Sequence, residues 1–311
     1  MLDRHMLLMY NNIKHYWRFD MEFRVLKYFL AIAREQSISG AAESLHISQP
    51  TLSRQIKDLE NELGKTLFIR GSHRITLTEE GMILRKRAEE MAELIRRTEN
   101  EIALSDQGVA GDVCIAAGET DGIRLIANLI KKLDEDYPLI KYHFISGNKS
   151  FVTEQLDKGL ADFGLTFGSV DNDKYEHFIL PAKDAWGVLM RRNSELAKKD
   201  RITVDDLLDK PLIVSKEISK NDHISKWFGC DIHTLNIRAT YNLATNAMIL
   251  ADEGIGYVVC FDKLFNVSGK SKLCFRPLYP VVEASMQIIW KKYQPQTKAA
   301  AKFLEALREI K

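Results

Sequence analysis

The stretch "SLHISQPTLSRQIKDLENELG" (residues 44–64) constrains the fold of this chain more than any other segment. Its apolar side chains recur at spacings of four and three, so one face of a helix becomes apolar. These side chains are Leu52, Ile56, Leu59 and Leu63. Ser48 is placed to cap the helix and Gly64 to end it. The opposite face begins with small polar residues and exposes Arg54 and Lys57, which an ordinary surface helix does not need.

Two shorter helices are predicted before this one. The first begins near Glu22 and has a core-facing stripe at helical spacing, formed by Leu26, Phe29, Leu30 and Ala33. The segment "SGAAESL" predicts the second helix, with Ser39 as its N-cap. A tight turn at residues 46–48 leads into the third helix, where Pro50 fits the first turn. Two short helices joined by a turn, the second with an exposed polar and basic start, are typical of a helix-turn-helix.

The segment "TLFIRGSHRITLT" (residues 66–78) predicts a β-hairpin, because two short apolar runs flank a turn with Gly71 at its tip. Residues 65–78 contain three basic side chains and one histidine but no acid. The net charge of the whole chain is only +1, so this positive charge is local. A basic hairpin beside a helix-turn-helix can act as a wing that lies on phosphates or in a minor groove.

We expect the start of the third helix and the wing to contact DNA. Small side chains let the helix N-terminus approach base edges, and its free amides favour phosphate. Gln, Thr and Ser can read base edges or bind phosphate, while Arg suits guanine or phosphate. The candidate DNA-binding residues are Ser48, Gln49, Pro50, Thr51, Ser53, Arg54, Lys57, Arg70, His73 and Arg74. The alternative is a solvated helix with a chance pair of positive charges, and the capped turn, the apolar register and the acid-free hairpin together argue against it.

Residues 29–81, "FLAIAREQSISGAAESLHISQPTLSRQIKDLENELGKTLFIRGSHRITLTEEG", resemble the winged helix-turn-helix of LysR-type transcriptional regulators. The matching motifs are paired alanines before the turn, Ser-Gln-Pro-Thr-Leu-Ser, Leu-Glu-x-x-Leu-Gly, Leu-Phe-x-Arg and Leu-Thr-x-x-Gly. The resemblance implies a recognition helix at residues 49–57 and a wing at residues 70–74.

A long helix is predicted next, over "TEEGMILRKRAEEMAELIRRTENEIALS". Apolar residues alternate at spacings of four and three, which is the a/d seam of a coiled coil. The candidate dimerisation residues are Leu84, Ala88, Met91, Ile95, Thr98 and Ile102. We expect this seam to pair two subunits, and the resemblance implies the same role. The alternative is that the helix packs against its own domain.

After "SDQGVAGD" the pattern changes to strands that alternate with helices, which predicts a parallel sheet with helices on both faces. The resemblance extends here, because the family's effector domain is similar to periplasmic binding proteins. The predicted fold class is therefore an N-terminal winged helix-turn-helix, a long linker helix and an α/β two-lobed, periplasmic-binding-protein-like effector domain. The predicted domains are an N-terminal extension (1–20), the winged helix-turn-helix (21–78), the linker helix (79–107) and the effector-binding domain (108–311), with lobe one at 111–181 and 287–311 and lobe two at 182–286.

Ligands of open α/β sheets bind beyond the carboxyl ends of strands. The candidate effector-binding residues lie at three such ends and in the segment "NLATNAM"; they are Gly118, Glu119, Thr120, Ser146, Gly147, Asn148, Thr166, Phe167, Thr245 and Asn246. Plain strand-end turns are the alternative for any one of them. Thr120 matches the family's first strand end. Two features depart from the family. Glu119 and Asp121 make the first strand end acidic, which argues against a small carboxylate ligand. Cys260-Phe261 stands where relatives carry Leu-Pro.

Several classes of protein are disfavoured by the sequence. The four cysteines are scattered without zinc spacing and are expected to be reduced thiols. An enzyme built on the α/β half would need a motif such as GxSxG, GxxxxGK[ST] or HExxH, and the chain has none. A solute-binding protein would leave the N-terminal third unexplained and would need a signal peptide, which the first 20 residues do not resemble. We therefore expect no catalytic residues, no metal, no cofactor, no membrane partner and a cytoplasmic location.

The expected function is a sequence-specific, LysR-type DNA-binding transcriptional regulator. Its C-terminal α/β cleft is expected to bind a small-molecule effector that modulates transcription of target genes. The expected partners are double-stranded operator DNA, the small-molecule effector and a second copy of the chain, in a homodimer that assembles to a tetramer. RNA polymerase is a further candidate partner.

Overall fold

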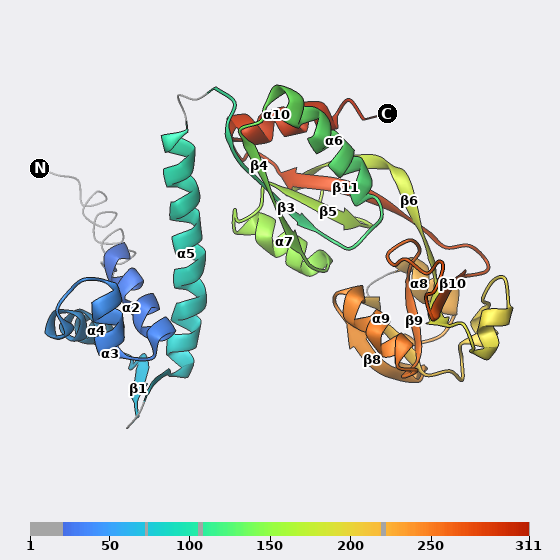
Figure 1. The fold of residues 1–311 in the computed structure, drawn as a ribbon, viewed down its shortest axis with the longest axis horizontal. Coiled ribbons are helices and arrows are strands. Elements are labelled where there is room, and N and C mark those ends of the chain that lie inside the picture. Colours follow the sequence, from blue (N-terminus) through green and yellow to red (C-terminus); the bar gives the residue numbers. More distant parts are fainter. Residues whose placement is uncertain (1–20, 72–73, 105–107, 219–221, 311) are drawn as a thin grey trace, which may run out of the picture. The chain divides into compact units, whose positions relative to one another are not determined.

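The computed structural model describes residues 21–71, 74–104, 108–218 and 222–310. The predicted extension at residues 1–20 and the candidate residue His73 lie outside these ranges. The chain divides into two compact units, Met1–Thr98 and Glu99–Lys311, which are drawn in Figure 1. No helix in the described ranges is long and apolar enough to cross a membrane.

The first unit contains the three predicted helices, the hairpin and the long helix. Its elements are α2 (Phe23–Glu35), α3 (Ile38–Ser44), α4 (Gln49–Leu63), β1 (Phe68–Arg70), β2 (Ile75–Leu77) and α5 (Glu79–Ala103), whose last residues belong to the second unit. The predicted apolar stripe of α4 is confirmed, since Leu52, Ile56 and Leu59 are buried. They share a core with Phe29, whose ring centroid lies 5.1 Å from that of Phe68. Burial of this stripe fixes which face of α4 remains in solvent.

The ends of α4 are capped as predicted. The Ser48 side chain accepts a hydrogen bond from the Thr51 amide, and Gly64 follows the last turn with a φ of 64°. The N-cap prediction for α3 was wrong: the helix begins two residues earlier, and Ser37 accepts the hydrogen bond from the Gly40 amide at 3.1 Å. Both serines are good N-cap residues and lie within three positions of Gly40, so the local sequence did not distinguish them.

The wing is tied to the helices by buried or partly buried hydrogen bonds. The Glu60 carboxylate on α4 accepts hydrogen bonds from the Leu67 amide at 2.7 Å and the Phe68 amide at 3.3 Å. At the other end of the hairpin, the Thr78 hydroxyl accepts from the Gly81 amide at 2.9 Å. A Cβ atom at Gly81 would lie 2.2 Å from the Leu67 carbonyl oxygen, so only glycine fits there. These contacts hold both ends of the hairpin in a fixed position beside α4.

The predicted seam of α5 has two different environments. Leu84 and Ala88 pack against the core of the first unit, and Ala88 is 0% exposed. These two residues therefore pack within their own domain, which was the alternative to a dimer seam. Met91 and Ile102 are 43% and 69% exposed. A pairing surface over the later part of α5 remains a prediction.

The second unit contains two sheets that share one strand. The first sheet has the order β4 (Ile140–Ser146), β3 (Gly111–Ala117), β5 (Phe163–Phe167), β11 (Glu283–Lys291) and β6 (Tyr175–Arg191). The second has the order β10 (Leu273–Pro277), β6, β9 (Tyr257–Phe261), β7 (Leu212–Ser215) and β8 (Ile237–Tyr241). The helical elements are α6 (Ile123–Asp136), α7 (Lys149–Asp157), η1 (Glu195–Lys198), η2 (Val204–Asp206), α8 (Asp222–Phe228), η4 (Ile232–Thr234), α9 (Ala244–Asp252) and α10 (Lys298–Leu307).

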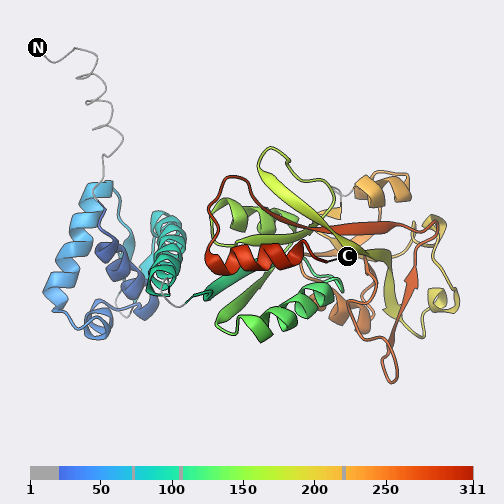
Figure 2. The same cartoon turned by 90° about the horizontal axis from the view of Figure 1, so that it is seen from above.

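Figures 1 and 2 show the yellow-green β6 running from one sheet into the other. We call the first sheet with α6, α7 and α10 the first lobe, and the second sheet with α8 and α9 the second lobe. The apolar run at residues 185–190 predicts a strand, but this is only the last part of β6, and no strand is predicted from the sequence at β10. It also predicted parallel sheets, whereas β6, β10 and β11 pair antiparallel. The predicted boundary at residues 181 and 182 falls inside β6.

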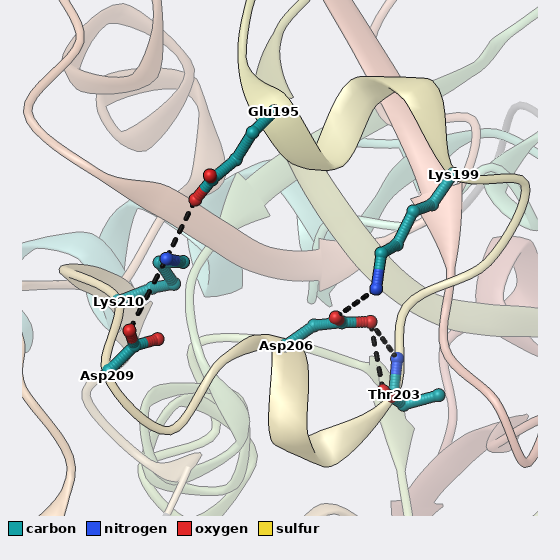
Figure 3. Close-up of polar contacts among 6 residues, drawn as sticks. All are labelled: Glu195, Lys199, Thr203, Asp206, Asp209 and Lys210. Atoms are coloured by element: carbon teal, nitrogen blue, oxygen red, sulfur yellow. Dashed lines mark hydrogen bonds and ion pairs between the residues drawn. The ribbon is translucent and has the colours of Figure 1, made fainter.

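A polar cluster holds together the segment of the second lobe that contains η1 and η2 (Figure 3). Lys199 pairs with Asp206, whose carboxylate also accepts hydrogen bonds from the amide and the hydroxyl of Thr203. Lys210 Nζ lies 2.7 Å from Glu195 Oε1. Burial alone would raise the pKa of Asp206, but the hydrogen bonds from Lys199 and Thr203 lower it below its ordinary value. The cluster is structural, because every one of these polar groups has a partner within it.

We predict that Ser37→Ala lowers the free energy of unfolding of the first unit by about 1 kcal/mol, because the helix loses its N-cap. Ser39→Ala is the matched control, since Ser39 is exposed and does not cap α3. Urea unfolding followed by far-UV circular dichroism measures both. An equal or larger loss for Ser39→Ala would contradict the N-cap assignment.

Candidate nucleic-acid interface and ligand cleft

The first turn of α4 and the wing form one set of exposed polar and basic side chains. The exposed candidates are Ser48, Gln49, Pro50, Thr51, Arg54, Lys57, Arg70 and Arg74, while Ser53 is half-buried. The Arg54 side chain is 83% exposed and pairs weakly with Asp58, with Nε and Oδ2 3.8 Å apart. A weak, exposed pair of this kind is readily exchanged for a phosphate or a base. Arg54 is therefore available to a nucleic acid.

The turn before α4 presents its N-terminus outward. His46 adopts a left-handed conformation with a φ of 55°, and the Ile47 amide donates to the Ala42 carbonyl at 3.0 Å. The first turn of α4 contains no acidic residue. The helix end therefore keeps the partial positive charge of its amides, which favours an anion such as phosphate.

Sequence reasoning missed one residue beside this surface. The Ser39 hydroxyl donates a hydrogen bond to Oε1 of Gln49 at 3.2 Å. The amide oxygen of Gln49 is thereby engaged, and its NH₂ group is the part left to donate to a partner. Ser39 and Gln49 are ten residues apart on different helices, so no local sequence pattern signals this contact.

A cavity of about 720 Å³ lies between the two lobes of the second unit. Of the ten predicted effector residues, six line it: Gly118, Glu119, Gly147, Asn148, Thr166 and Phe167. Four do not, namely Thr120, Ser146, Thr245 and Asn246. Thr120 is buried because its hydroxyl closes the turn after β3, where it accepts from the Gly122 amide at 2.9 Å. The cavity therefore lies at the carboxyl ends of the strands, where the sequence predicted a ligand site. Which side chains line it depends on the packing of each turn.

The sequence missed the residues that the second lobe contributes, including Trp186, Glu217, Tyr241 and Phe261. Phe261 stands between two other rings, with centroid distances of 4.6 Å to Phe167 and 4.3 Å to Trp186. It occupies the position where the resemblance led us to expect proline. That departure places an aromatic group at the centre of the cavity wall.

Two carboxylates accept hydrogen bonds across the cavity from the opposite lobe. The Glu119 carboxylate accepts from the Ala244 amide and from the Thr245 hydroxyl, the latter at 3.3 Å. The Glu217 carboxylate of the second lobe accepts from the Ser150 hydroxyl of the first. Both contacts join a carboxylate to the first turn of a helix that opens on the cavity.

Within the residues that the structure describes, no three or more His, Cys, Asp or Glu side chains gather where they could hold a metal. All four cysteines are free, as expected from their scattered positions. Burial raises the pKa of the Cys260 thiol to about 12, so this thiol is protonated at neutral pH.

The sequence matches two family models: "Bacterial regulatory helix-turn-helix protein, lysR family" over residues 23–82, and "LysR substrate binding domain" over residues 106–310. It is 34% identical over 188 residues to the HTH-type transcriptional regulator CysL of Bacillus subtilis (strain 168), which covers 60% of this chain and 62% of that protein. The match to BsdA of the same organism is 35% identical over 155 residues, or 49% of this chain and 53% of BsdA. The chain thus matches less than two thirds of the length of these two relatives. An uncharacterised regulator of Shigella flexneri, YfeR, is 25% identical over 93% of this chain and 94% of its own length.

Solved structures show the same fold. Full-length CbnR complexed with its target DNA has a TM-score of 0.73 and 23% identity, and the match covers 94% of this chain and 100% of that chain. HinK from Pseudomonas aeruginosa, described as a LysR family transcriptional regulator, has a TM-score of 0.53 and 22% identity over 93% of this chain and 98% of that chain.

We predict that Asp184→Asn stabilises the second unit at neutral pH. Asp184 lies on β6, is 2% exposed, and its Oδ2 has no hydrogen-bond partner among the described residues. Burial raises the pKa of its carboxyl above the ordinary 3.8, and the charge of Asp262 raises it further. The folded chain therefore holds this proton more tightly than the unfolded chain, so stability falls as the pH rises above 3.8 through the raised pKa.

Urea unfolding followed by tryptophan fluorescence tests this, because the described tryptophans, Trp186, Trp227 and Trp290, all lie in the second unit. The gain from Asp184→Asn should be larger at about pH 7.5 than at about pH 4.5. Asp136→Asn, at the exposed end of α6, is the control. A gain that does not depend on pH would rule out ionisation of Asp184 as its cause.

Proposed function

This chain belongs to the LysR family of bacterial transcriptional regulators, and on that basis we propose that it binds double-stranded operator DNA sequence-specifically through α4 and the wing. A small-molecule effector in the cavity between the lobes then alters transcription of its target genes. The observation that carries the DNA part is the exposed, acid-free first turn of α4, with Arg54 free to leave its weak pair with Asp58. Since its partner is DNA, we expect the protein to act in the cytoplasm.

The base-reading surface is the first turn of α4, and the wing positions it. Buried Leu52, Ile56 and Leu59 hold the apolar face of α4, so the polar face can enter a major groove. Arg70 and Arg74 are exposed at the two ends of the hairpin tip, where they would contact the backbone or a minor groove. Glu60 fixes the wing to α4, so both surfaces act as one body.

Effector binding would act through the two lobes. A ligand that binds one arrangement of the lobes better than another shifts the equilibrium between them by its difference in affinity. The cavity is lined by side chains of both lobes, so such a difference is expected. An enzymatic function has less support, because the described chain holds no metal cluster and its thiols at Cys114, Cys260 and Cys274 are buried.

We also propose that two chains pair through the later part of α5. Met91, Ile95, Thr98 and Ile102 lie within about 60° of one another around the helix, at 100° per residue. Met91 and Ile102 are exposed large apolar side chains, which a monomer would leave in water. A dimer would present two copies of α4 to half-sites about one helical turn apart, or a multiple of it. Assembly of dimers to a tetramer remains a further proposal.

For DNA binding, we predict that Arg54→Ala weakens operator affinity by about 1–3 kcal/mol and relaxes sequence preference, because a base-edge contact is lost. Arg74→Ala should weaken binding to all sequences alike and reduce the salt slope by about 1. Fluorescence anisotropy with DNA from upstream of the protein's own gene, titrated with salt, measures both. Arg24→Ala, which removes an exposed arginine of α2, is the control. Weak binding that is indifferent to sequence and to Arg54 would contradict the assignment of α4.

For pairing, we predict that Met91→Glu raises the dimer dissociation constant at least about tenfold, because a charge would be buried at a seam position. Met82→Glu is the matched control: Met82 is 58% exposed on nearly the opposite side of the same helix. Sedimentation velocity over a range of concentrations gives the dissociation constants. Equal effects of the two substitutions would place the interface elsewhere.

A further inference from the structure

We propose that the effector is an organic cation, a protonated amine next to an aromatic group, and that it competes with two helix N-termini for the carboxylates of Glu119 and Glu217. The proposal rests on the proposed function in one respect, that the cavity between the lobes is the effector site. It goes further in naming the charge of the ligand and the contacts that it replaces.

The first of these contacts is an N-terminal cap supplied from the other lobe. Helix α9 begins after Leu243, whose side chain makes no capping hydrogen bond. Glu119, in the loop after β3 of the first lobe, accepts hydrogen bonds from the Ala244 amide and the Thr245 hydroxyl instead. A carboxylate at this place satisfies a free amide and neutralises the partial positive charge of the helix end.

The second contact runs in the opposite direction. Helix α7 of the first lobe begins at the cavity, with Asn148 as its N-cap. Glu217, which follows β7 of the second lobe, accepts a hydrogen bond from Ser150 in the first turn of α7. Neither α7 nor α9 has an acidic residue of its own in its first turn. Each lobe therefore supplies the anion for a helix of the other.

These carboxylates make the cavity unsuited to an anionic ligand. Glu119 already occupies the Ala244 amide at the start of α9. At the start of α7 the Asn148 side chain accepts from the Phe151 amide, while Glu217 holds the Ser150 hydroxyl. An anion would have to displace carboxylates that are tethered nearby and therefore present at high effective concentration. Glu283 also lines the cavity, but it is paired with Lys183 at 2.7 Å, so the carboxylates of Glu119 and Glu217 remain and outnumber the ammonium of Lys149 in the lining. An incoming negative charge would be repelled, whereas an amine would be attracted.

The rest of the lining suits an aromatic amine that also carries a neutral polar group. Phe167, Phe261 and Trp186 form a contiguous aromatic wall, and such faces attract cations. Thr166 Oγ1 and Trp186 Nε1, in side chains that are 2% and 5% exposed, have no hydrogen-bond partner within the described part of the chain. Buried polar groups normally have partners. A hydroxyl or carbonyl on the ligand would supply one, and the indole N–H specifically needs an acceptor.

Binding of a cation would change the contacts between the lobes. An ammonium offers three donors and a full charge, whereas a helix end offers amides with a fractional charge. Where it takes carboxylate oxygens from Ala244 or Ser150, a bond between the lobes is lost and the preferred arrangement of the lobes shifts. The same two glutamates would then act in ligand recognition and in its coupling to the rest of the protein.

Three ligands that share a PhCH(OH)CH₂– group and differ in the charge of the group attached to it test the proposal: 2-amino-1-phenylethanol, 3-hydroxy-3-phenylpropanoate and 1-phenyl-1,2-ethanediol. Isothermal titration calorimetry on the full-length protein should show the amine binding at least about tenfold more tightly than the carboxylate or the diol. Glu217→Gln keeps the size and an acceptor but removes the charge, and it should reduce the preference for the amine about tenfold. Glu119→Gln should act in the same direction. Glu305→Gln, an exposed glutamate of α10 outside the lining, should leave all three affinities unchanged.

Tighter binding of the carboxylate than of the amine would overturn the proposal, and so would the absence of binding by all three ligands. An unchanged preference in both Glu217→Gln and Glu119→Gln would also overturn it, provided that circular dichroism shows both variants to be folded. Operator binding is measured on the same preparations. Loss of DNA binding with the amine preference intact would count against the proposed function alone, and the reverse result would count against the ligand class alone.

Discussion

Strand β6 is hydrogen-bonded to two sheets at once, and every feature of the cavity depends on that arrangement. Its first part pairs with β11 as far as Ala185, and from Trp186 onward it pairs with β9 and β10. The two lobes are therefore connected by continuous backbone hydrogen bonding rather than by a loose linker. Asp184, buried without a partner for one oxygen in the described structure, and the aromatic wall at Trp186 both lie at this crossing. A buried carboxylate and the aromatic wall of the cavity thus lie together at the point where the lobes meet.

The charges of the cavity follow from two helices that begin there. Helix ends with no acidic residue of their own attract an anion. In this chain the anions are Glu119 and Glu217, each from the opposite lobe. The first turns of these helices, which could otherwise bind an external anion, instead contact a glutamate of the opposite lobe. This is the physical reason for expecting a ligand of the opposite charge, and it connects the acidic rim noted in the sequence with a specific geometry.

In the first unit, too, the N-terminus of a helix is the important feature, but there it remains open to solvent. Burial of Leu52, Ile56 and Leu59 leaves the polar face of α4 in solvent, and the capped turn directs its N-terminus outward. Here the helix end is kept free of acids. Glu60, near the other end of the helix, accepts hydrogen bonds from the wing amides of Leu67 and Phe68. The N-terminus of α4, which we propose binds DNA phosphate, therefore has no carboxylate in its first turn. The first turns of α7 and α9, at the cavity, instead donate hydrogen bonds to a glutamate of the opposite lobe.

The sequence by itself determined the parts of the protein whose signals are local. The apolar stripe and caps of α4, the hairpin of β1 and β2 and the length of α5 can be read from neighbouring residues, because helix and strand periods repeat within a few positions. Ser39 and Ser37 show the limit of that reading, since both are good caps and packing chose between them. Only the tertiary structure decided which residues form the cavity. Phe167 and Phe261, or Glu119 and Ala244, are far apart in the chain and meet because β6 joins two sheets, and no local period encodes such a meeting.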